Sequence, residues 1–221
     1  MVRRRTAVSI AAAALLAASP ALTACGSGPA HPGAAAVVGD QKITVSTLQH
    51  QVNQVRDAQA KSPQAAQLTS QSGKLSRQTL TMLVQSEVID KAAADAGVTV
   101  SDAEVQQMHA QALQQFQGDE AQFEQAVLEQ AQVAPSGIDD YFRTTLQVNK
   151  LEQSLGYQPG SDTATEALVA ALAKTSKSLG VHVNPRYGTW DVKQAVIGDT
   201  KEPWVVTKSA SSASAVADPT A

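Results

Sequence analysis

The clearest pattern of apolar and polar positions lies between residues 75 and 116. Apolar residues recur there at helical spacing, at Leu80, Leu83, Val84, Val88, Ala92 and Ala96, and then at Val105, Met108, Ala112 and Phe116. Between the two runs, Gly97 can adopt the left-handed conformation that ends a helix, and residues 98–100 favour an extended chain. Ser101 and Glu104 have the spacing of a capping box. The pattern therefore predicts one long helix, a tight break and a second helix.

Shorter patterns predict the remaining elements. Residues 35–43 have the pattern of two short strands around a turn, and residues 181–183 alternate like a half-buried strand. A two-stranded hairpin is too short to be stable alone, so we expect these strands to form one small sheet that joins the two ends of the domain. Side chains that can cap a helix precede further apolar runs at Thr44, Asp119, Ser136 and Thr163. Residues 61–73 are rich in Ser, Gln and Pro, which predicts a loop.

Three of these segments resemble one protein family. Residues 80–105 contain an apolar helix followed by Ala-Asp-Ala-Gly-Val-Thr-Val-Ser-Asp-Ala-Glu-Val, residues 37–44 read Val-Val-Gly-Asp-Gln-Lys-Ile-Thr, and residues 181–188 read Val-His-Val-Asn-Pro-Arg-Tyr-Gly. These motifs are similar to those of the N-terminal chaperone domain of SurA and PrsA-type foldases. A generic helical hairpin with a good cap is the alternative explanation for the first motif.

The resemblance implies a fold class and domain limits. We expect a mostly α, SurA N-terminal-like helical domain over residues 35–191, with a small β-sheet joining the N-terminal hairpin to a C-terminal strand. Residues 192–221 form a C-terminal extension, which is Ser/Ala-rich beyond residue 208 and is expected to be disordered from about that point.

The first residues have the pattern of a lipoprotein leader. Arg3, Arg4 and Arg5 precede a short apolar run, and Leu22-Thr23-Ala24-Cys25 resembles a bacterial lipobox. We therefore expect a signal peptide at residues 1–24, lipidation of Cys25 and a tether at residues 25–34. Two acyl chains give stable membrane attachment, so the protein would be anchored to the cell membrane on its extracytoplasmic side. The alternative is an ordinary secretory signal followed by a chance cysteine.

Composition excludes several classes of function. Cys25 is the only cysteine, so an intramolecular disulfide and a CxxC redox pair are excluded. The chain has 17 basic and 20 acidic residues. Without the three arginines of the leader, 14 basic residues remain against 20 acidic ones, which gives a net charge of −6. This acidic balance argues against nucleic acid as a partner. Aromatic residues make up only 4%, so a core of small and aliphatic side chains with shallow surface grooves is expected.

No catalytic or cofactor-binding motif is present in the sequence. HExxH, GxSxG, SxxK, Walker A and GxGxxG are all absent. SurA and PrsA proteins usually carry parvulin prolyl-isomerase domains before the returning strand. Here only residues 156–180 lie in that place, and a folded domain needs at least about 50 residues. We therefore expect no enzyme activity, no cofactor and no metal.

Isolated polar residues give only weak candidates for a site. His31, His50, His109 and His182 are scattered, and the pattern favours a boundary position for His109 over metal binding. Asp139 and Asp140 are expected to be first-turn acids, because adjacent helix residues do not face each other. A recognition patch is one interpretation of Arg186, Tyr187 and Trp190. We favour the other interpretation, in which they belong to a fixed turn.

Two functions from different classes follow. In the first, the protein is a lipid-anchored, extracytoplasmic, chaperone-like holdase that binds unfolded or secreted polypeptides without prolyl isomerase activity. In the alternative, it is a structural or complex-forming envelope lipoprotein with one dedicated protein partner. The sequence identifies no peptide-contacting residues, clients or oligomeric state. A broad apolar groove favours the first function, and a compact patch of aromatic or Arg anchors favours the second.

The lipid anchor gives a direct prediction. The substitution Cys25→Ser removes the thiol that the acyl chains require, so it should release the protein from membranes without changing its helical circular dichroism. Membrane fractionation measures this. Wild-type protein found entirely in the soluble extracytoplasmic fraction would contradict the prediction.

Overall fold

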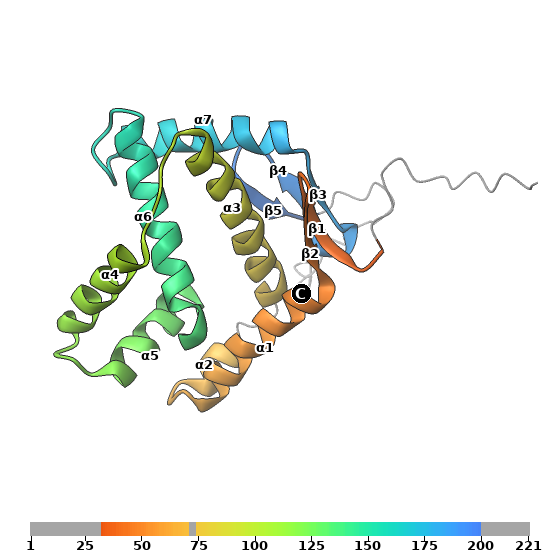
Figure 1. Cartoon of the computed structure of the whole chain (residues 1–221). Helices are drawn as coiled ribbons and strands as arrows, with labels where there is room; N and C mark the ends of the chain where they lie inside the picture. The colour runs from red at the N-terminus through yellow and green to blue at the C-terminus, as the bar shows by residue number, and fades with distance from the viewer. Residues whose placement is uncertain (1–31, 71–73, 200–221) are drawn as a thin grey trace, which may run out of the picture. The chain divides into compact units, whose positions relative to one another are not determined.

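The computed structural model describes residues 32–70 and 74–199 (Figure 1). The expected signal peptide at residues 1–24, the lipidation site Cys25 and the tether up to residue 31 lie outside the described residues. So do residues 200–221, including the part expected to be disordered from about 208.

Helices dominate the described part of the chain, as the sequence predicts. The helices are α1 (Val45–Lys61), α2 (Ala65–Ser70), α3 (Leu75–Asp95), α4 (Asp102–Gln115), α5 (Glu120–Ala131), α6 (Ile138–Ser154) and α7 (Asp162–Leu179). The strands are β1 (Ala34–Val38), β2 (Gln41–Thr44), β3 (Val181–Val183), β4 (Thr189–Asp191) and β5 (Val196–Gly198). None of the helices in these two described stretches is both long and apolar enough to cross a bilayer.

Most of the predicted helix limits are confirmed. Ser101 accepts a hydrogen bond from the Glu104 amide, and the Glu104 carboxylate accepts one from the Ser101 amide at 2.9 Å, which completes the capping box of α4. The side chains of Thr44 and Asp119 cap α1 and α5 by accepting hydrogen bonds from the amides of Thr47 and Gln122. Gly97 has a φ of +67°, so it provides the left-handed residue that separates α3 from α4.

Three local predictions are wrong. Residues 61–73 are not simply a loop, because α1 runs to Lys61 and α2 follows, with Leu68 packed against the core. The first residue of α7 is Asp162, since Ser161 rather than Thr163 accepts the bond from the Ala164 amide. Pro135–Gly137 forms a 3₁₀ turn, so Ser136 does not cap α6 and that helix begins without a side-chain cap.

The predicted sheet between the two ends of the domain is confirmed. The strand order is β2-β1-β3, with both pairs antiparallel and Ala36 opposite Val183. Asn184 extends the pairing: its amide donates to the Ala35 carbonyl at 2.9 Å and its side chain donates to the Ala34 carbonyl at 3.2 Å. All five residues of β1 are buried, so this strand lies in the core rather than at the surface.

The ordered chain continues beyond residue 191, the limit set from the resemblance. β4 and β5 form a second antiparallel pair. Trp190 on β4 is buried, and its indole nitrogen donates to the Ser176 hydroxyl of α7 at 2.6 Å. Ile197 on β5 is buried in the same cluster as the helices. Residues 192–198 are therefore part of the helical domain.

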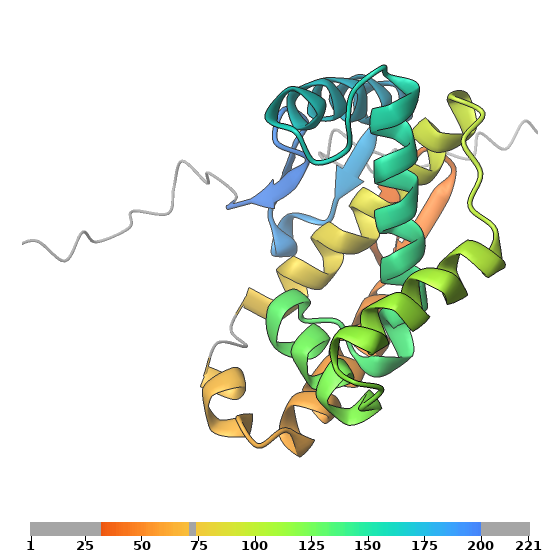
Figure 2. The same ribbon diagram turned by 90° about the vertical axis from the view of Figure 1, so that its left-hand side faces the viewer.

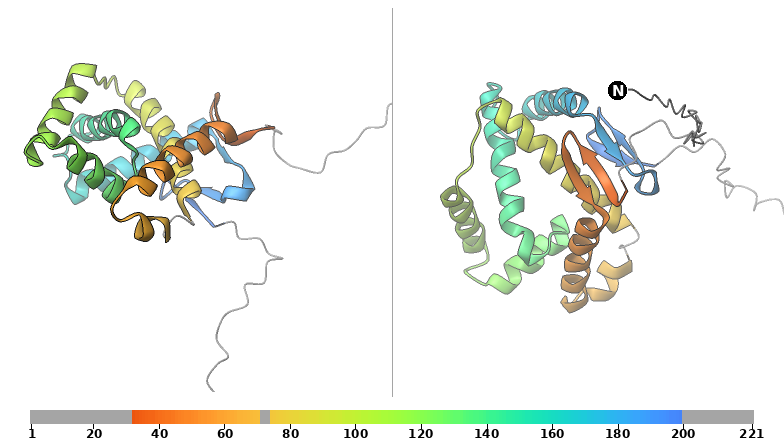
Figure 3. Two further views of the ribbon diagram at one scale, coloured as in Figure 1. Left: turned by 90° about the horizontal axis from the view of Figure 1, so that it is seen from below. Right: turned by 45° about the vertical axis from the view of Figure 1, so that its right-hand side comes forward.

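The core has two parts. The larger cluster surrounds α3 and includes Leu80, Val84 and Val88 together with residues from the three-stranded sheet and from both β4 and β5. The smaller cluster joins α4, α5 and α6 and includes Phe123 and Phe142. α6 lies between α4 and α3 (Figures 1 and 3), and α7 crosses the C-terminal ends of α3 and α6 (Figures 1 and 2).

The sheet gives a prediction about stability. Ending the chain after Gly180 removes β3 and the buried side chains of Trp190 and Ile197, each worth about 1.5–3 kcal/mol of burial. The free energy of unfolding should therefore fall by at least about 3 kcal/mol. At about 2–4 °C per kcal/mol for a domain of this size, the Tm should fall by about 6 °C or more.

A chain that ends after Asp199 is the matched control, because it keeps β3, β4 and β5. It should melt like the full chain in a thermal scan followed by circular dichroism. An unchanged Tm after truncation at Gly180 would refute the structural role of the returning strand.

Candidate functional site

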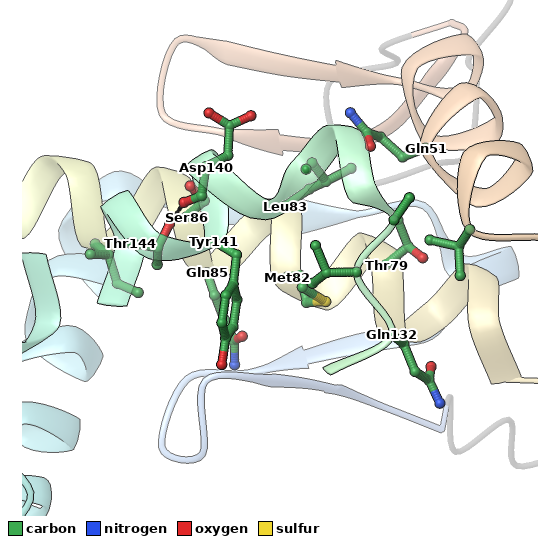
Figure 4. A pocket seen from close by; sticks show the side chains of 15 residues that line it. Gln51, Thr79, Met82, Leu83, Gln85, Ser86, Gln132, Asp140, Tyr141 and Thr144 are labelled. Carbon is green, nitrogen blue, oxygen red and sulfur yellow. Dashed lines mark hydrogen bonds between the residues drawn. The ribbon is translucent and has the colours of Figure 1, made fainter. Parts of the chain in front are cut away.

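A groove opens between α3 and α6 on the surface of the described domain, and we call it the α3–α6 groove. Its volume is about 290 Å³. Its walls come from four segments: α1, α3, the α5–α6 connection and the first turns of α6. The larger side chains around the opening are drawn in Figure 4, where Met82 lies between Tyr141 on one side and Gln132 on the other.

α3 forms the floor with a second face, offset from its core stripe. Its groove residues are Thr79, Met82, Leu83, Gln85, Ser86 and Ile89. Met82 keeps 38% of its surface exposed, whereas Leu80 and Val84 on the core face are inaccessible to solvent. One helix thus buries an apolar stripe and also presents Met82 and Leu83 to the groove beside the polar side chains of Gln85 and Ser86.

The α5–α6 connection forms one wall. α5 ends at Gln132, which has a φ of +55°, and this left-handed residue redirects the chain so that Val133 and Ala134 line the groove. Gly137 lines it too, and a Cβ atom there would approach Cγ1 of Val133 to 3.3 Å. On α6, Asp140, Tyr141 and Thr144 continue the wall. Tyr141 is 38% exposed.

The rim is polar but nearly uncharged. Gln51 of α1, Gln85 of α3 and Gln132 place amide groups around the opening, and such groups both donate and accept hydrogen bonds. Asp140 is the one acidic side chain that lines the groove, and Lys, Arg and His are absent from its described lining. The arrangement suits an apolar side chain together with backbone amides, because both kinds of partner are available within one opening.

The face of α6 opposite the groove is fixed to α4 and α5. Nδ1 of His109 on α4 lies 2.9 Å from Asp139, its Nε2 lies 3.4 Å from Glu120, and Gln106 donates to Asp139 at 3.1 Å. Arg143 binds Asp102 at 2.7 Å. These contacts hold the first turns of α6, and with them the groove wall, in place.

The hydrogen bond between His109 and Asp139 changes both pKa values. It raises the pKa of His109, although partial burial of the imidazole works in the other direction. It also lowers the pKa of Asp139, with a smaller contribution from Gln106. The ring of His109 packs 5.1 Å from the ring of Phe123 and 5.8 Å from that of Phe142, measured between centroids. His109 is therefore a boundary histidine, as the sequence predicts.

The other candidates from the sequence do not form a site together. Asp139 is hydrogen-bonded to His109, whereas Asp140 lines the groove. The two adjacent carboxylates therefore lie on different faces of α6. Trp190 is buried, and the guanidinium of Arg186 lies 5.2 Å from the ring centre of Tyr187, so these three do not make one exposed patch. No cluster of His, Cys, Asp and Glu suited to a metal occurs among the described residues. Cys25 and His31 lie outside them.

Comparison with known families places the groove in a known domain. The family model for the SurA-like N-terminal domain matches residues 1–152. The chain belongs to the SurA-like N-terminal domain family. The match includes α1 to α5 and nearly all of α6, and thus every segment that lines the α3–α6 groove. No curated protein and no solved structure matches the chain. The family is related to chaperones, which accords with the apolar groove.

Of the groove residues on α3, the main apolar stripe predicted from the sequence includes only Leu83, although a second signal was present. Met82, Ser86 and Ile89 follow helical spacing on α3, beside the stronger stripe of Leu80, Val84 and Val88. The wall at residues 132–134 carries no comparable signal, because Gln132 adopts its left-handed conformation without a glycine.

The His109 contacts give a prediction about pH. The pKa of His109 is raised in the folded protein, so its pairing stabilises the fold fully below the unfolded value of about 6.5 and is lost as pH rises through the folded value. The free energy of unfolding should fall between pH 6 and pH 8, by about 1 kcal/mol or less for this partly exposed pair. Urea unfolding at both pH values measures it.

His109→Gln should flatten this pH dependence, and His50→Gln is the matched control, because His50 is hydrogen-bonded within α1 to Gln54 alone. The prediction fails if wild type and His109→Gln show the same change in stability from pH 6 to pH 8.

Proposed function

We propose that this protein is a lipid-anchored, extracytoplasmic, chaperone-like protein that holds unfolded secreted polypeptides in the α3–α6 groove. The observation that carries the proposal is an exposed apolar groove within a SurA-like N-terminal domain. The anchor at Cys25 is inferred from the leader sequence. It would hold the groove at the membrane surface, where secreted chains emerge before they have folded.

The chemistry of the groove supports a broad range of clients. Met82 lies at its centre, and a methionine side chain adapts to irregular apolar partners because it is unbranched and polarizable. The amides of Gln51 and Gln132 are suited to the backbone that every polypeptide shares, whereas the Gln85 amide nitrogen already donates to the Ala195 carbonyl. A volume of about 290 Å³ lies at the lower edge of the roughly 300–1,000 Å³ found for ligand pockets. It therefore suits a short segment of an extended chain.

Binding at this groove should be weak. Met82 and Tyr141 are each 38% exposed, so covering them yields only about a third of the 1.5–3 kcal/mol for full burial, or about 0.5–1 kcal/mol each. The client must add the burial of its own apolar side chains, and association costs roughly 4 kcal/mol or more. A weak, reversible complex fits a protein that holds clients and releases them.

The proposal includes no catalytic step. The described residues between α6 and β3 form the single helix α7 and its connections. We expect the protein to leave the cis/trans isomerisation rate of a prolyl peptide unchanged, a process that takes tens of seconds or more without a catalyst. A rate that rises in proportion to protein concentration would overturn this part of the proposal.

The groove itself can be tested with a charge. Met82→Glu places a carboxylate at the centre of the groove, and burying that charge against an apolar client is costly. The variant should lose most of the ability of the chain from residue 26 onward to suppress aggregation of a denatured model protein, measured by light scattering. Val169→Glu is the matched control, because Val169 is 37% exposed on α7 and lies outside the groove.

Equal suppression by both variants would contradict the assignment of the groove. If wild type fails to suppress aggregation at a several-fold molar excess and instead captures one envelope protein stoichiometrically, the dedicated-partner function replaces the holdase function.

A further inference from the structure

The chain carries its own short apolar segment just beyond the described residues. Residues 203–206 read Pro-Trp-Val-Val, with Lys201 and Glu202 before them and Thr207 and Lys208 after them. From residue 209 to the last residue the sequence consists mainly of Ser and Ala, without aromatic residues. Beyond Asp199, the large apolar residues are therefore concentrated in residues 203–206.

β5 brings this segment to the groove. The Gln85 side chain, which lines the groove, donates to the Ala195 carbonyl at 2.7 Å. Further along, the Ile197 amide donates to the Thr81 hydroxyl at 3.4 Å, and Asp199 pairs with Arg77. β5 thus runs antiparallel to α3 along the side of the groove, and the last described residue lies at the first turns of α3.

The length of the chain allows the apolar segment to reach the groove. Trp204 is five residues after Asp199, a reach of up to about 17 Å at roughly 3.3–3.6 Å per residue. Met82 is five residues after Arg77 on α3, a distance of about 7.5 Å at 1.5 Å per residue. Trp204, Val205 and Val206 can therefore lie over Met82 without displacing β5.

Charge and polarity also fit this occupant. Asp140 is the acidic residue of the groove, and residues 201–208 carry two lysines and one glutamate, a net charge of +1. A negatively charged lipid surface fits less well, because the described lining offers no basic side chain. The proline at position 203 has a fixed φ, which lowers the entropic cost of holding an extended segment in a groove.

We propose that residues 203–206 of the chain occupy its own α3–α6 groove when no client is bound, and that a client binds by displacing them. The inference rests on the proposed function, since the same groove serves both. A short tether gives an effective concentration on the order of 1 mM. If the free segment binds with a Kd of about 0.1 mM, its presence in the chain weakens binding of a competitor by about tenfold.

The test uses a labelled peptide with the sequence of residues 201–208, Lys-Glu-Pro-Trp-Val-Val-Thr-Lys, and fluorescence anisotropy. Three chains that begin at residue 26 are compared: one ending at residue 221, one ending at residue 209 and one ending after Asp199, which keeps β5 and its pair with Arg77. The chain ending after Asp199 should bind the peptide about tenfold more tightly than the other two. Trp204→Ser in the full-length chain should restore tight binding without any truncation.

Specificity is tested by two controls. A peptide with Ser in place of Trp should not bind, and Met82→Glu in the chain ending after Asp199 should abolish binding while Val169→Glu should not. Equal affinity of the full and truncated chains, or binding that Met82→Glu leaves unchanged, overturns the proposal. So does an affinity of the full chain that falls as its own concentration rises, since the segment would then occupy a second copy.

Failure of this inference is distinguishable from failure of the proposed function. If the chain ending after Asp199 suppresses aggregation of a denatured protein but does not bind the peptide, the groove binds clients and the self-occupancy is wrong. If it does neither, both proposals fall.

Discussion

Leu80, Val84 and Val88 of α3 are almost inaccessible to solvent, and their burial requires segments from both ends of the domain. β1 supplies one side of this environment, but its backbone groups are paired only when β2 and β3 lie beside it. β3 follows α7, about 140 residues after β1. The central helix, the sheet and α7 therefore depend on one another. Such long-range pairing is costly in loop entropy, and it explains why the returning strand is necessary for the domain as a whole.

The composition of the chain explains why this core leaves a groove. Aromatic side chains are only 4% of the sequence, and the three phenylalanines gather in the smaller cluster between α4, α5 and α6. Apart from Trp190 and the partly buried Tyr187, small and aliphatic residues make up the larger cluster around α3. Among residues 32–70 and 74–199, the face of α3 that carries Met82 has α1 and α6 at its sides and no helix or strand across it. The hydrogen bond between His109 and Asp139 fixes α6 to α4 on the side opposite the groove. The opening is therefore a consequence of how the helices pack.

Much of the fold could be predicted from the sequence. The structure confirms the capping box at Ser101 and the break at Gly97, which are local features of the sequence. It also confirms the pairing of the first hairpin with residues 181–183, which was expected because a two-stranded hairpin is too short to be stable alone. The errors occurred where competing caps lie close together, as at Ser161 and Thr163, or where tertiary contacts fix a short helix, as in α2. The domain continues past residue 191, the C-terminal limit expected from the resemblance. The strand β5 is only three residues long and is stabilised by packing against α3, so its local sequence does not predict it.

The groove was predicted only as a general expectation of shallow apolar surface. Its wall depends on the left-handed Gln132 and on the position of α6, and both are results of packing between segments distant in sequence. Among the candidates from the sequence, only Asp140 lines it. Membership of the SurA-like N-terminal domain family agrees with polypeptide binding in general. Family membership does not identify which surface binds the polypeptide, so the choice of the α3–α6 groove rests on its geometry and chemistry.

The central claim is that the α3–α6 groove contacts the client. A photo-crosslinking amino acid placed at position 82 or position 141 tests it most directly, with position 169 on α7 as the reference site. A permanently unfolded polypeptide should be crosslinked at positions 82 and 141, and an excess of unlabelled apolar peptide should prevent this. Crosslinking confined to position 169, or equal at all three positions, would contradict it.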